Sequence, residues 1–255
     1  MLYLDSISRR EDRPRPEYYP FSVPSLMRLD RLTFHTPITF LAGENATGKS
    51  TLLEALAAGM DAYAIGASGR VVDDPYLSHA LELAGTFYFS RRRASRIRMF
   101  LRSEDVLGHI RSLNEERLED FRYEMEKQER ADLPDYDEVK RSIIRGNELD
   151  GRSHGERFLH ILGERLHGGG LYFLDEPEAP LSPVNQIRLA QMLRGASRAG
   201  GQFIVATHSP VLLGLPEATI YEFNDDGIVQ KRYEELTSVR LLKRFLAAPE
   251  RYLDD

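Results

Sequence analysis

Residues 43–50 have the pattern G-x-x-x-x-G-K-S, in which glycines, a lysine and a hydroxyl are spaced to hold phosphate groups. Backbone N–H groups of such a loop, together with the N-terminus of a following helix, attract anions. Lys49 supplies a cation for the outer phosphates, and Ser50 supplies a hydroxyl ligand for Mg²⁺. An apolar run at 38–42 precedes the loop and a helical pattern at 51–56 follows it, which a chance glycine-rich turn does not explain. The sequence therefore predicts a P-loop for a nucleoside triphosphate, with ATP expected, contacted by Gly43, Glu44, Asn45, Ala46, Thr47, Gly48, Lys49, Ser50 and Thr51.

Two further polar groups follow apolar runs that are typical of strands. Asp175 and Glu176 come directly after the run at 171–174, and His208 comes shortly after the run at 202–206. The carboxyl ends of parallel strands form the ligand-binding edge of an α/β sheet. We therefore expect Asp175 to hold Mg²⁺, mostly through water, and Glu176 to orient and deprotonate the attacking water. His208 is expected to hydrogen-bond the terminal phosphate. The structural alternatives are a helix-capping acidic pair and an ordinary packed histidine.

Alternating strand and helix patterns supply the elements that would position these groups. From residue 151 onward, the β-α-β order predicts a mainly parallel sheet covered by helices. Short alternating runs around 26–34 predict strands of an N-terminal antiparallel part. The expected fold is therefore α/β, of the P-loop NTPase type. Expected helices are 50–64, 155–167, 184–199 and 236–248; further expected strands are 83–89, 97–101, 218–223 and 227–230, and 66–75 is expected to be a loop.

Composition limits the classes of protein that fit. The chain has 255 residues, 42% of them hydrophobic, which suits one large domain covering 1–255. The formal net charge of −6 does not indicate nucleic-acid binding overall. There are no cysteines, which excludes disulfides and thiolate metal sites and agrees with a cytoplasmic location. No signal-peptide pattern or membrane-spanning run is present, so no membrane insertion is expected.

The segment 91–149 differs from the rest of the chain. It contains 14 Lys or Arg and 14 Asp or Glu residues, so it is highly charged yet balanced. Within it, Leu118, Phe121 and Met125 form a thin apolar stripe at helical spacing. This pattern predicts an exposed helical insertion at about 103–149 within the single domain. A solvated arm without a specific partner is an equally open interpretation.

The three motifs together resemble the ABC-type ATPase family. Asp175-Glu176-Pro177 matches the Walker B end of that family, and His208 matches its switch histidine. The resemblance implies a signature loop before Walker B, and Ser153-His154-Gly155-Glu156 stands there. This form differs from the L-S-G-G-Q of transporters and is similar to the chromosome-maintenance and recombination-repair branch. In that branch Ser153 and the Gly155 backbone would reach the γ-phosphate on the opposing subunit; an ordinary serine N-cap is the structural alternative.

The resemblance extends to small stand-alone predicted bacterial ATPases of the same branch. Residues 175–182, 168–172 and 249–253 carry it, and it is weakest between 103 and 148. It implies a Mg²⁺-dependent ATPase that forms a head-to-tail homodimer around two ATP molecules.

Three departures from the family pattern are visible. Ala46 stands where glycine is usual, which costs energy if the position needs a positive φ. No clear Q-loop glutamine follows the P-loop, and Glu104 is the candidate for its metal- and water-contacting place, with a solvated helix-start acid as the alternative. The adenine-stacking aromatic is not evident: Tyr19 and Phe21 are candidates, although packing roles suit both.

Six arginines without an intervening acid lie at the start of the charged segment: Arg91, Arg92, Arg93, Arg96, Arg98 and Arg102. Such a cluster suits phosphate-backbone binding, solvated strand faces or pairing with the acids that follow Ser112.

Three functional interpretations stay open. The first is a motor or switch in DNA-related or defence processes, acting with DNA, a nuclease or another effector subunit. The second is the ATP-binding subunit of a membrane transporter, and the third is a nucleotide switch that does not hydrolyse.

Overall fold

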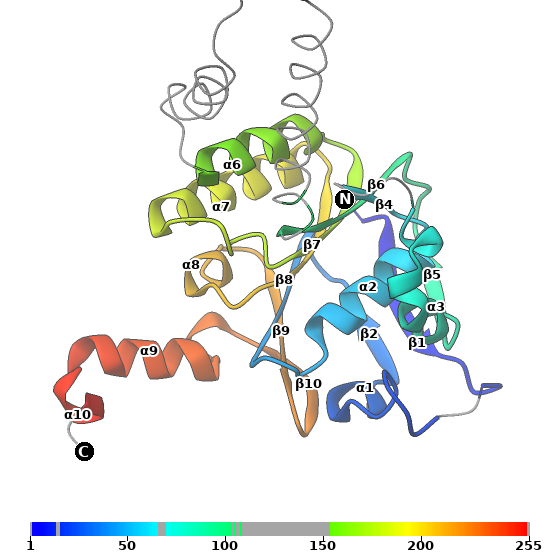
Figure 1. The fold of residues 1–255 in the computed structure, drawn as a ribbon, viewed down its shortest axis with the longest axis horizontal. Helices are drawn as coiled ribbons and strands as arrows, with labels where there is room; N and C mark the ends of the chain where they lie inside the picture. Colours follow the sequence, from blue (N-terminus) through cyan, green and yellow to red (C-terminus); the bar gives the residue numbers. More distant parts are fainter. Residues whose placement is uncertain are drawn as a thin grey trace, which may run out of the picture.

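We analysed a computed structural model of the chain, which describes residues 2–13, 16–65, 70–103, 105, 108 and 154–253. Within this part, the chain forms a large, mainly parallel sheet with helices on both faces and a small antiparallel sheet packed beside it (Figure 1). The expected α/β fold, with its antiparallel N-terminal part, is therefore confirmed. The charged insertion expected at about 103–149 lies almost entirely outside the described residues.

The large sheet has the strand order β10-β9-β3-β8-β7-β6-β4. Neighbours from β9 to β4 run parallel, and β10 pairs antiparallel with β9. Three strands that precede the sequence motifs are thus adjacent, because β8 lies between β3 and β7. The strand bounds are β3 (Ile38–Gly43), β4 (Tyr63–Ile65), β6 (Ile97–Arg102), β7 (Gly170–Asp175), β8 (Gln202–Ala206), β9 (Thr219–Asn224) and β10 (Gly227–Lys231).

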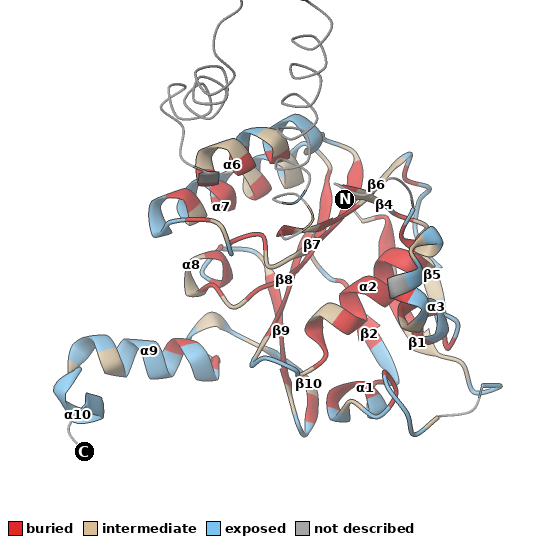
Figure 2. Cartoon of the chain, in the orientation of Figure 1, coloured by how far each residue is buried: buried red, intermediate tan, exposed pale blue. Residues whose placement is uncertain are grey.

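Both faces of the central strands are buried, which explains why these strands read as continuous apolar runs. On β7, Leu171 and Phe173 pack on one side of the sheet. Tyr172 and Leu174, which alternate with them, pack on the other side. Figure 2 shows the buried central strands between the two layers. The sheet therefore holds the loops at its carboxyl edge on a rigid base.

Helices α2 (Lys49–Gly59) and α3 (Ser78–Ala84) cover one face together with the small sheet. Helices α6 (His154–Arg165), α7 (Pro183–Arg198) and α8 (Pro210–Leu213) cover the other. Helix α9 (Thr237–Ala247) extends from the body, is mostly exposed, and is followed by α10 (Glu250–Leu253) (Figures 1 and 2). The remaining helical segments are short: α1 (Pro24–Met27), η1 (Val71–Asp73), η2 (Pro75–Leu77) and η3 (Tyr233–Glu235).

The small sheet contains β2 (Arg31–Thr33), β1 (Leu4–Arg9) and β5 (Phe87–Arg91), with β1 in the middle and both pairs antiparallel. A fully buried amide joins it to the large sheet. The Gln202 Oε1 atom accepts hydrogen bonds from the backbone N atoms of Tyr3 (2.6 Å) and Leu4 (2.9 Å). The Gln202 Nε2 atom donates to the Leu4 carbonyl at 2.8 Å. One side chain on β8 therefore satisfies three backbone groups at the start of β1.

Some expected elements differ from the structure. Residues 83–84 end helix α3, and the strand expected from 83 begins only at Phe87. Gly85 and Thr86 make the turn between them, and the apolar residues Leu83 and Ala84 are buried on a helix. The helix expected to reach residue 64 ends at Gly59, because the chain turns there and continues into β4. A short 3₁₀ turn lies within the expected loop at 66–75, of which 66–69 are not described.

Candidate functional site

The predicted P-loop connects β3 to α2 and folds into a tight turn. The Lys49 Nζ atom donates to the Glu44 carbonyl at 2.7 Å, and the Thr47 hydroxyl donates to the same carbonyl at 2.8 Å. Helix α2 begins at Lys49, so its unpaired N–H groups point toward the loop. This places a helix N-terminus and the predicted lysine at one anion-attracting position.

The loop glycines have steric reasons to be glycine. Gly43 and Gly48 have φ of +140° and +95°. A Cβ at Gly43 would lie 2.5 Å from the Phe223 carbonyl, and one at Gly48 would lie 2.8 Å from a Val23 methyl group. Ala46 also has a positive φ, +61°. The condition stated in the sequence analysis, a positive φ at this position, is therefore met, and alanine is strained there.

Helix α1 supports the P-loop from below, which sequence reasoning did not anticipate. The buried Ser25 hydroxyl donates to the Thr47 carbonyl at 2.5 Å. Nearby, the Tyr19 hydroxyl lies 3.2 Å from the Thr51 hydroxyl, and its ring packs 5.3 Å from His79. Phe21, the other aromatic candidate, is buried in the core and has the packing role. Of these two aromatic residues, Tyr19 therefore stays a candidate for contact with the adenine ring of ATP.

Lys49 lies among acidic groups. Its side chain is buried, and desolvation lowers the pKa of its ammonium group. The carboxylates of Glu176, Asp175, Glu44 and Glu178 act in the opposite direction. Burial therefore disfavours the charged form of Lys49, and the surrounding carboxylates favour it.

Ser50 and Asp175 meet at the expected magnesium position. The Ser50 hydroxyl, on the first turn of α2, donates to Asp175 Oδ1 at the end of β7 at 2.9 Å. Burial raises the pKa of Asp175 to about 6, and the Ser50 hydrogen bond opposes this shift. Two oxygen donors at this spacing fit Mg²⁺, which takes one or two protein ligands and fills its other positions with phosphate and water. Among the described residues, no group of three His, Asp or Glu forms a denser metal site.

Glu176 and His208 are brought together at the ends of β7 and β8. His208 Nε2 lies 3.1 Å from Glu176 Oε1, within ion-pair distance. Glu176 has a φ of +45°, and its backbone N donates to the Ala206 carbonyl at 2.9 Å. This unusual backbone turns the chain after β7 and fixes Glu176 beside the loop that carries His208.

A residue without an assigned role in the sequence analysis, Glu178, holds the His208 loop. It is buried, and its Oε1 atom accepts hydrogen bonds from Thr207 Oγ1, His208 N and Ser209 N at 2.5, 2.8 and 3.1 Å. The position of Glu178 along the chain gave no sign that it would bind residues 207–209, about 30 positions further on.

Two of the predicted residues cannot be placed. Ser153 and Glu104 lie outside the described residues. Gly155, on the first turn of α6, is described and is buried. A Cβ at Gly155 would lie 3.0 Å from the Pro180 carbonyl and 3.2 Å from Asn185 Nδ2. The start of α6 therefore packs directly on the segment that follows Glu176.

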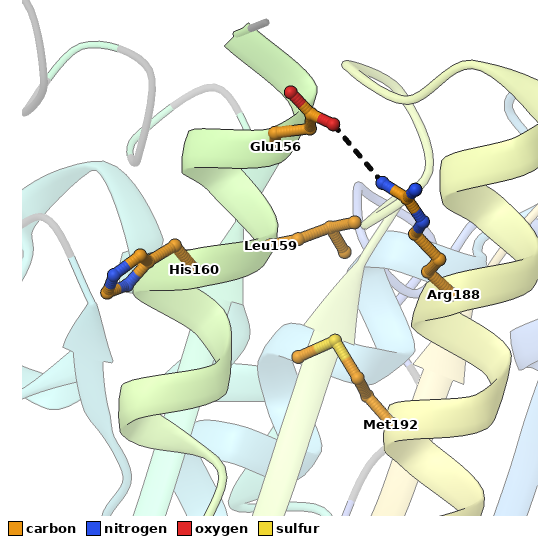
Figure 3. Close-up of a pocket in the computed structure, with 5 residues that line it drawn as sticks. All are labelled: Glu156, Leu159, His160, Arg188 and Met192. Carbon is orange, nitrogen blue, oxygen red and sulfur yellow. Dashed lines mark hydrogen bonds and ion pairs between the residues drawn. The ribbon is translucent and has the colours of Figure 1, made fainter. Parts of the chain in front are cut away.

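A second contact fixes α6 against α7. Glu156 pairs with Arg188 at 3.2 Å, across the two helices (Figure 3). Leu159 and Met192 lie between the helices, and with His160 these residues line a pocket of about 350 Å³ (Figure 3). The orientation of the predicted signature helix is thus set by both α7 and the turn after β7.

The arginine cluster is spread over β5, β6 and the turn between them. Arg92 pairs with Asp5 at 2.6 Å and Arg98 with Asp61 at 3.3 Å. Arg102 pairs with Glu54 on α2, whose other oxygen contacts His79 Nε2 at 2.7 Å. Three of the six arginines thus form ion pairs with acids outside the segment after Ser112, which is not described.

Comparisons with known proteins agree with this arrangement. A family model described as "AAA domain, putative AbiEii toxin, Type IV TA system" matches residues 156–214, which run from α6 to the end of α8. The chain is 32% identical over 190 residues to ABC transporter G family member 11 of Arabidopsis thaliana. That alignment covers 68% of this chain and 24% of the transporter, so the chain spans about a quarter of its relative.

Solved structures with a similar course of the chain include two SMC heads and a transporter. The SMC head domain from Thermotoga maritima has 14% identity and a TM-score of 0.48, covering 91% of this chain and all of that one. The Smc head derived from Pyrococcus furiosus, bound to the C-terminal domain of ScpA, has 13% identity and a TM-score of 0.49, covering 96% of this chain and 100% of that one. A putative metal-chelate type ABC transporter has 17% identity and a TM-score of 0.48, covering 96% and 90%.

None of the described helices is long and apolar enough to cross a membrane. The P-loop between β3 and α2, the acidic end of β7 beside it and the matched family model are consistent with the resemblance to ABC-type P-loop ATPases.

Proposed function

We propose that this protein binds ATP with Mg²⁺ and hydrolyses it. The observation that carries the proposal is the convergence of four groups at the ends of three adjacent strands: Lys49 after β3, Asp175 and Glu176 after β7, and His208 after β8. Phosphoryl transfer requires mainly positioning and charge stabilisation, and these four groups supply both.

Each residue has a separate part in the proposed reaction. Lys49 and the loop N–H groups hold the outer phosphates, and Ser50 with Asp175 would hold the metal. Bound Mg²⁺ would neutralise charge on the phosphates. Glu176 takes the proton from the attacking water, because Asp175 is committed to the metal. His208, 3.1 Å from Glu176 Oε1, would donate a hydrogen bond toward the terminal phosphate.

We also propose that two copies assemble head to tail when ATP is bound. The support is the placement of Gly155 at the start of α6, directly against the Pro180 carbonyl in the turn that follows Glu176. In the proposed dimer, Ser153 and the Gly155 backbone of one copy contact the γ-phosphate held by the other. The energy of ATP binding then closes the dimer, and hydrolysis opens it.

The test combines turnover with mass measurement. Glu176→Gln should retain ATP binding and hydrolyse at least about 100-fold more slowly, because a positioned base contributes about 10²- to 10⁴-fold. Light scattering should show a dimer of this variant with ATP and a monomer without it. Adding Ser153→Arg should prevent dimer formation, because a bulky side chain blocks closure. Glu164→Gln, which changes an exposed acid on α6, is the control and should behave as the parent. Unchanged turnover in Glu176→Gln would exclude Glu176 as the base.

The biological process is a finer proposal. The first candidate is a motor or switch in defence or DNA-related processes, with DNA, a nuclease or another effector as partner. The description of the matched family as a putative toxin supports the defence role. The identity to an ABC transporter supports a second candidate, the ATP-binding subunit of a transporter. Affinity capture on Glu176→Gln with ATP distinguishes them: a membrane-embedded protein supports the second candidate, and a nuclease or DNA supports the first.

A further inference from the structure

The turn after β7 brings a second glutamate into the interior. Two hydrogen bonds form this turn, from Ala179 N to the Glu176 carbonyl at 3.0 Å and from Leu181 N to the Glu178 carbonyl at 2.8 Å. The turn directs Glu178 inward, where only 8% of its surface is exposed. Glu176, two residues earlier, has 44% of its side chain exposed, so the two acids face different surroundings.

Glu178 binds three consecutive residues of the loop after β8. Its Oε1 atom accepts from the Thr207 hydroxyl at 2.5 Å, from His208 N at 2.8 Å and from Ser209 N at 3.1 Å. Hydrogen bonds to an ionised acceptor are stronger than those to a neutral one. The carboxylate therefore fixes the backbone on both sides of His208.

The other side of this loop is held independently of Glu178. The Ser209 hydroxyl donates to Gln186 Oε1 at 2.7 Å and accepts from Val211 N and Leu212 N at the start of α8. Ser209 is therefore anchored to both α7 and α8. Glu178 supplies the matching anchor toward the turn after β7, which also carries Glu176.

Burial of the Glu178 carboxylate costs free energy of folding. The Glu178 Oε2 atom is buried and has no hydrogen-bond partner among the described residues. A buried polar atom without a partner destabilises the folded state. The strength of the three bonds to Oε1 is the benefit that offsets this cost, and all three are made to the loop of His208.

We propose that Glu178 is a positioning residue that sets the distance between His208 and Glu176. This inference rests on the proposed function, in which His208 contacts the terminal phosphate. Because Glu178 and Glu176 belong to one turn, a shift of that turn moves the loop of His208 with it. The base and the histidine therefore keep their 3.1 Å separation when the turn moves.

The first test is kinetic and uses Glu178→Gln, which keeps the size of the side chain and removes its charge. We expect kcat to fall about tenfold, because the three bonds become neutral and the loop is held less firmly. The Kd for ATP should change less than about threefold, since the P-loop is not altered. The double variant Glu178→Gln with His208→Ala should be no slower than His208→Ala alone, because residues that act as one unit are not additive. Additive losses would overturn the proposal.

The second test does not depend on turnover. The imidazole signals of the seven histidines are followed by NMR, and the His208 signal is identified by its loss in His208→Ala. Glu178→Gln should shift or broaden the His208 signal and leave that of exposed His160 unchanged, whereas Glu164→Gln should leave His208 unchanged. An unmoved His208 signal would overturn the proposal. If the parent protein hydrolyses no ATP, the proposed function fails while this measurement still decides the role of Glu178. Should Glu178→Gln not fold, Glu178→Asp, which shortens the side chain and keeps its charge, replaces it in both tests.

Discussion

Two regions concentrate charge: the sheet edge that carries the P-loop, Asp175, Glu176 and His208, called here the P-loop edge, and the arginine cluster. They differ in what the charged groups contact. At the P-loop edge, Lys49 is buried among carboxylates that belong to the same site. In the arginine cluster, by contrast, Arg92, Arg98 and Arg102 each pair with an acid from another part of the chain. The first arrangement gathers charge around a position for a ligand, and the second neutralises charge within the fold.

This difference shows why charge must be judged by partners and not by spacing along the chain. When the sequence is read alone, six arginines over twelve positions leave open a phosphate-binding surface, a solvated strand face and internal pairing. The acids that pair with them, such as Glu54 and Asp61, lie about 40 positions away and meet them only in the folded sheet. We therefore expect the loss of Lys49 to affect ligand binding more than the loss of any of the three paired arginines.

The largest effect is expected at the P-loop edge. Lys49→Ala should abolish measurable ATP binding, because the loop loses the cation that holds the outer phosphates. Titration calorimetry with ATP and Mg²⁺ measures this directly. Lys243→Ala, which removes an exposed lysine on α9, should bind as the parent does. Parent-like affinity in Lys49→Ala would remove the distinction between the two regions.

An intermediate effect is expected in the arginine cluster. Arg102→Ala should lower the free energy of unfolding by about 2 kcal/mol, because buried Glu54 loses its guanidinium partner. Thermal unfolding measures the change, and Arg96→Ala, at an exposed position of the same cluster, should leave it near zero. If the cluster were a nucleic-acid surface instead, replacing Arg91, Arg92 and Arg93 by Ala would weaken salt-sensitive DNA binding without lowering the melting temperature.

The smallest effect is expected from Ala46→Gly. Glycine relieves about 1 kcal/mol of left-handed strain, and the greater freedom of the unfolded chain offsets roughly half of it. The expected net stabilisation is about 0.5 kcal/mol, seen as a small rise in melting temperature. Ala94→Gly is the control: this exposed residue has no positive φ, so the same exchange should destabilise there. A loss of stability in Ala46→Gly would mean that the loop is not strained at this position.

The sequence predicted the central strands and the groups at their ends well. Continuous apolar runs such as 171–174 occur because both faces of the strand are buried, and that pattern is local. The prediction of one strand over 83–89 was wrong, because only the short turn at Gly85 and Thr86 separates the apolar residues that end α3 from those that start β5.

Contacts between distant segments could not be predicted. The bonds from Glu178 to the His208 loop, and from Ser25 to Thr47, depend on strand order and on how short helices pack. The roles of Ser153 and Glu104 stay predictions, since both lie outside the described residues. Ala46 is the reverse case: the sequence showed that alanine would be strained there if the backbone had a positive φ, and the φ of +61° meets that condition.

The buried amide of Gln202 has a mechanical consequence. It joins the first residue of β8 to β1 through three hydrogen bonds, while the last residue of β8, Ala206, leads directly to the loop of His208. A strand of this length spans about 16 Å. β8 therefore connects the small sheet, at its first residue, to the loop of His208, at its last residue. Displacement of the small sheet reaches the histidine loop through one hydrogen-bonded strand, with no flexible linker between them.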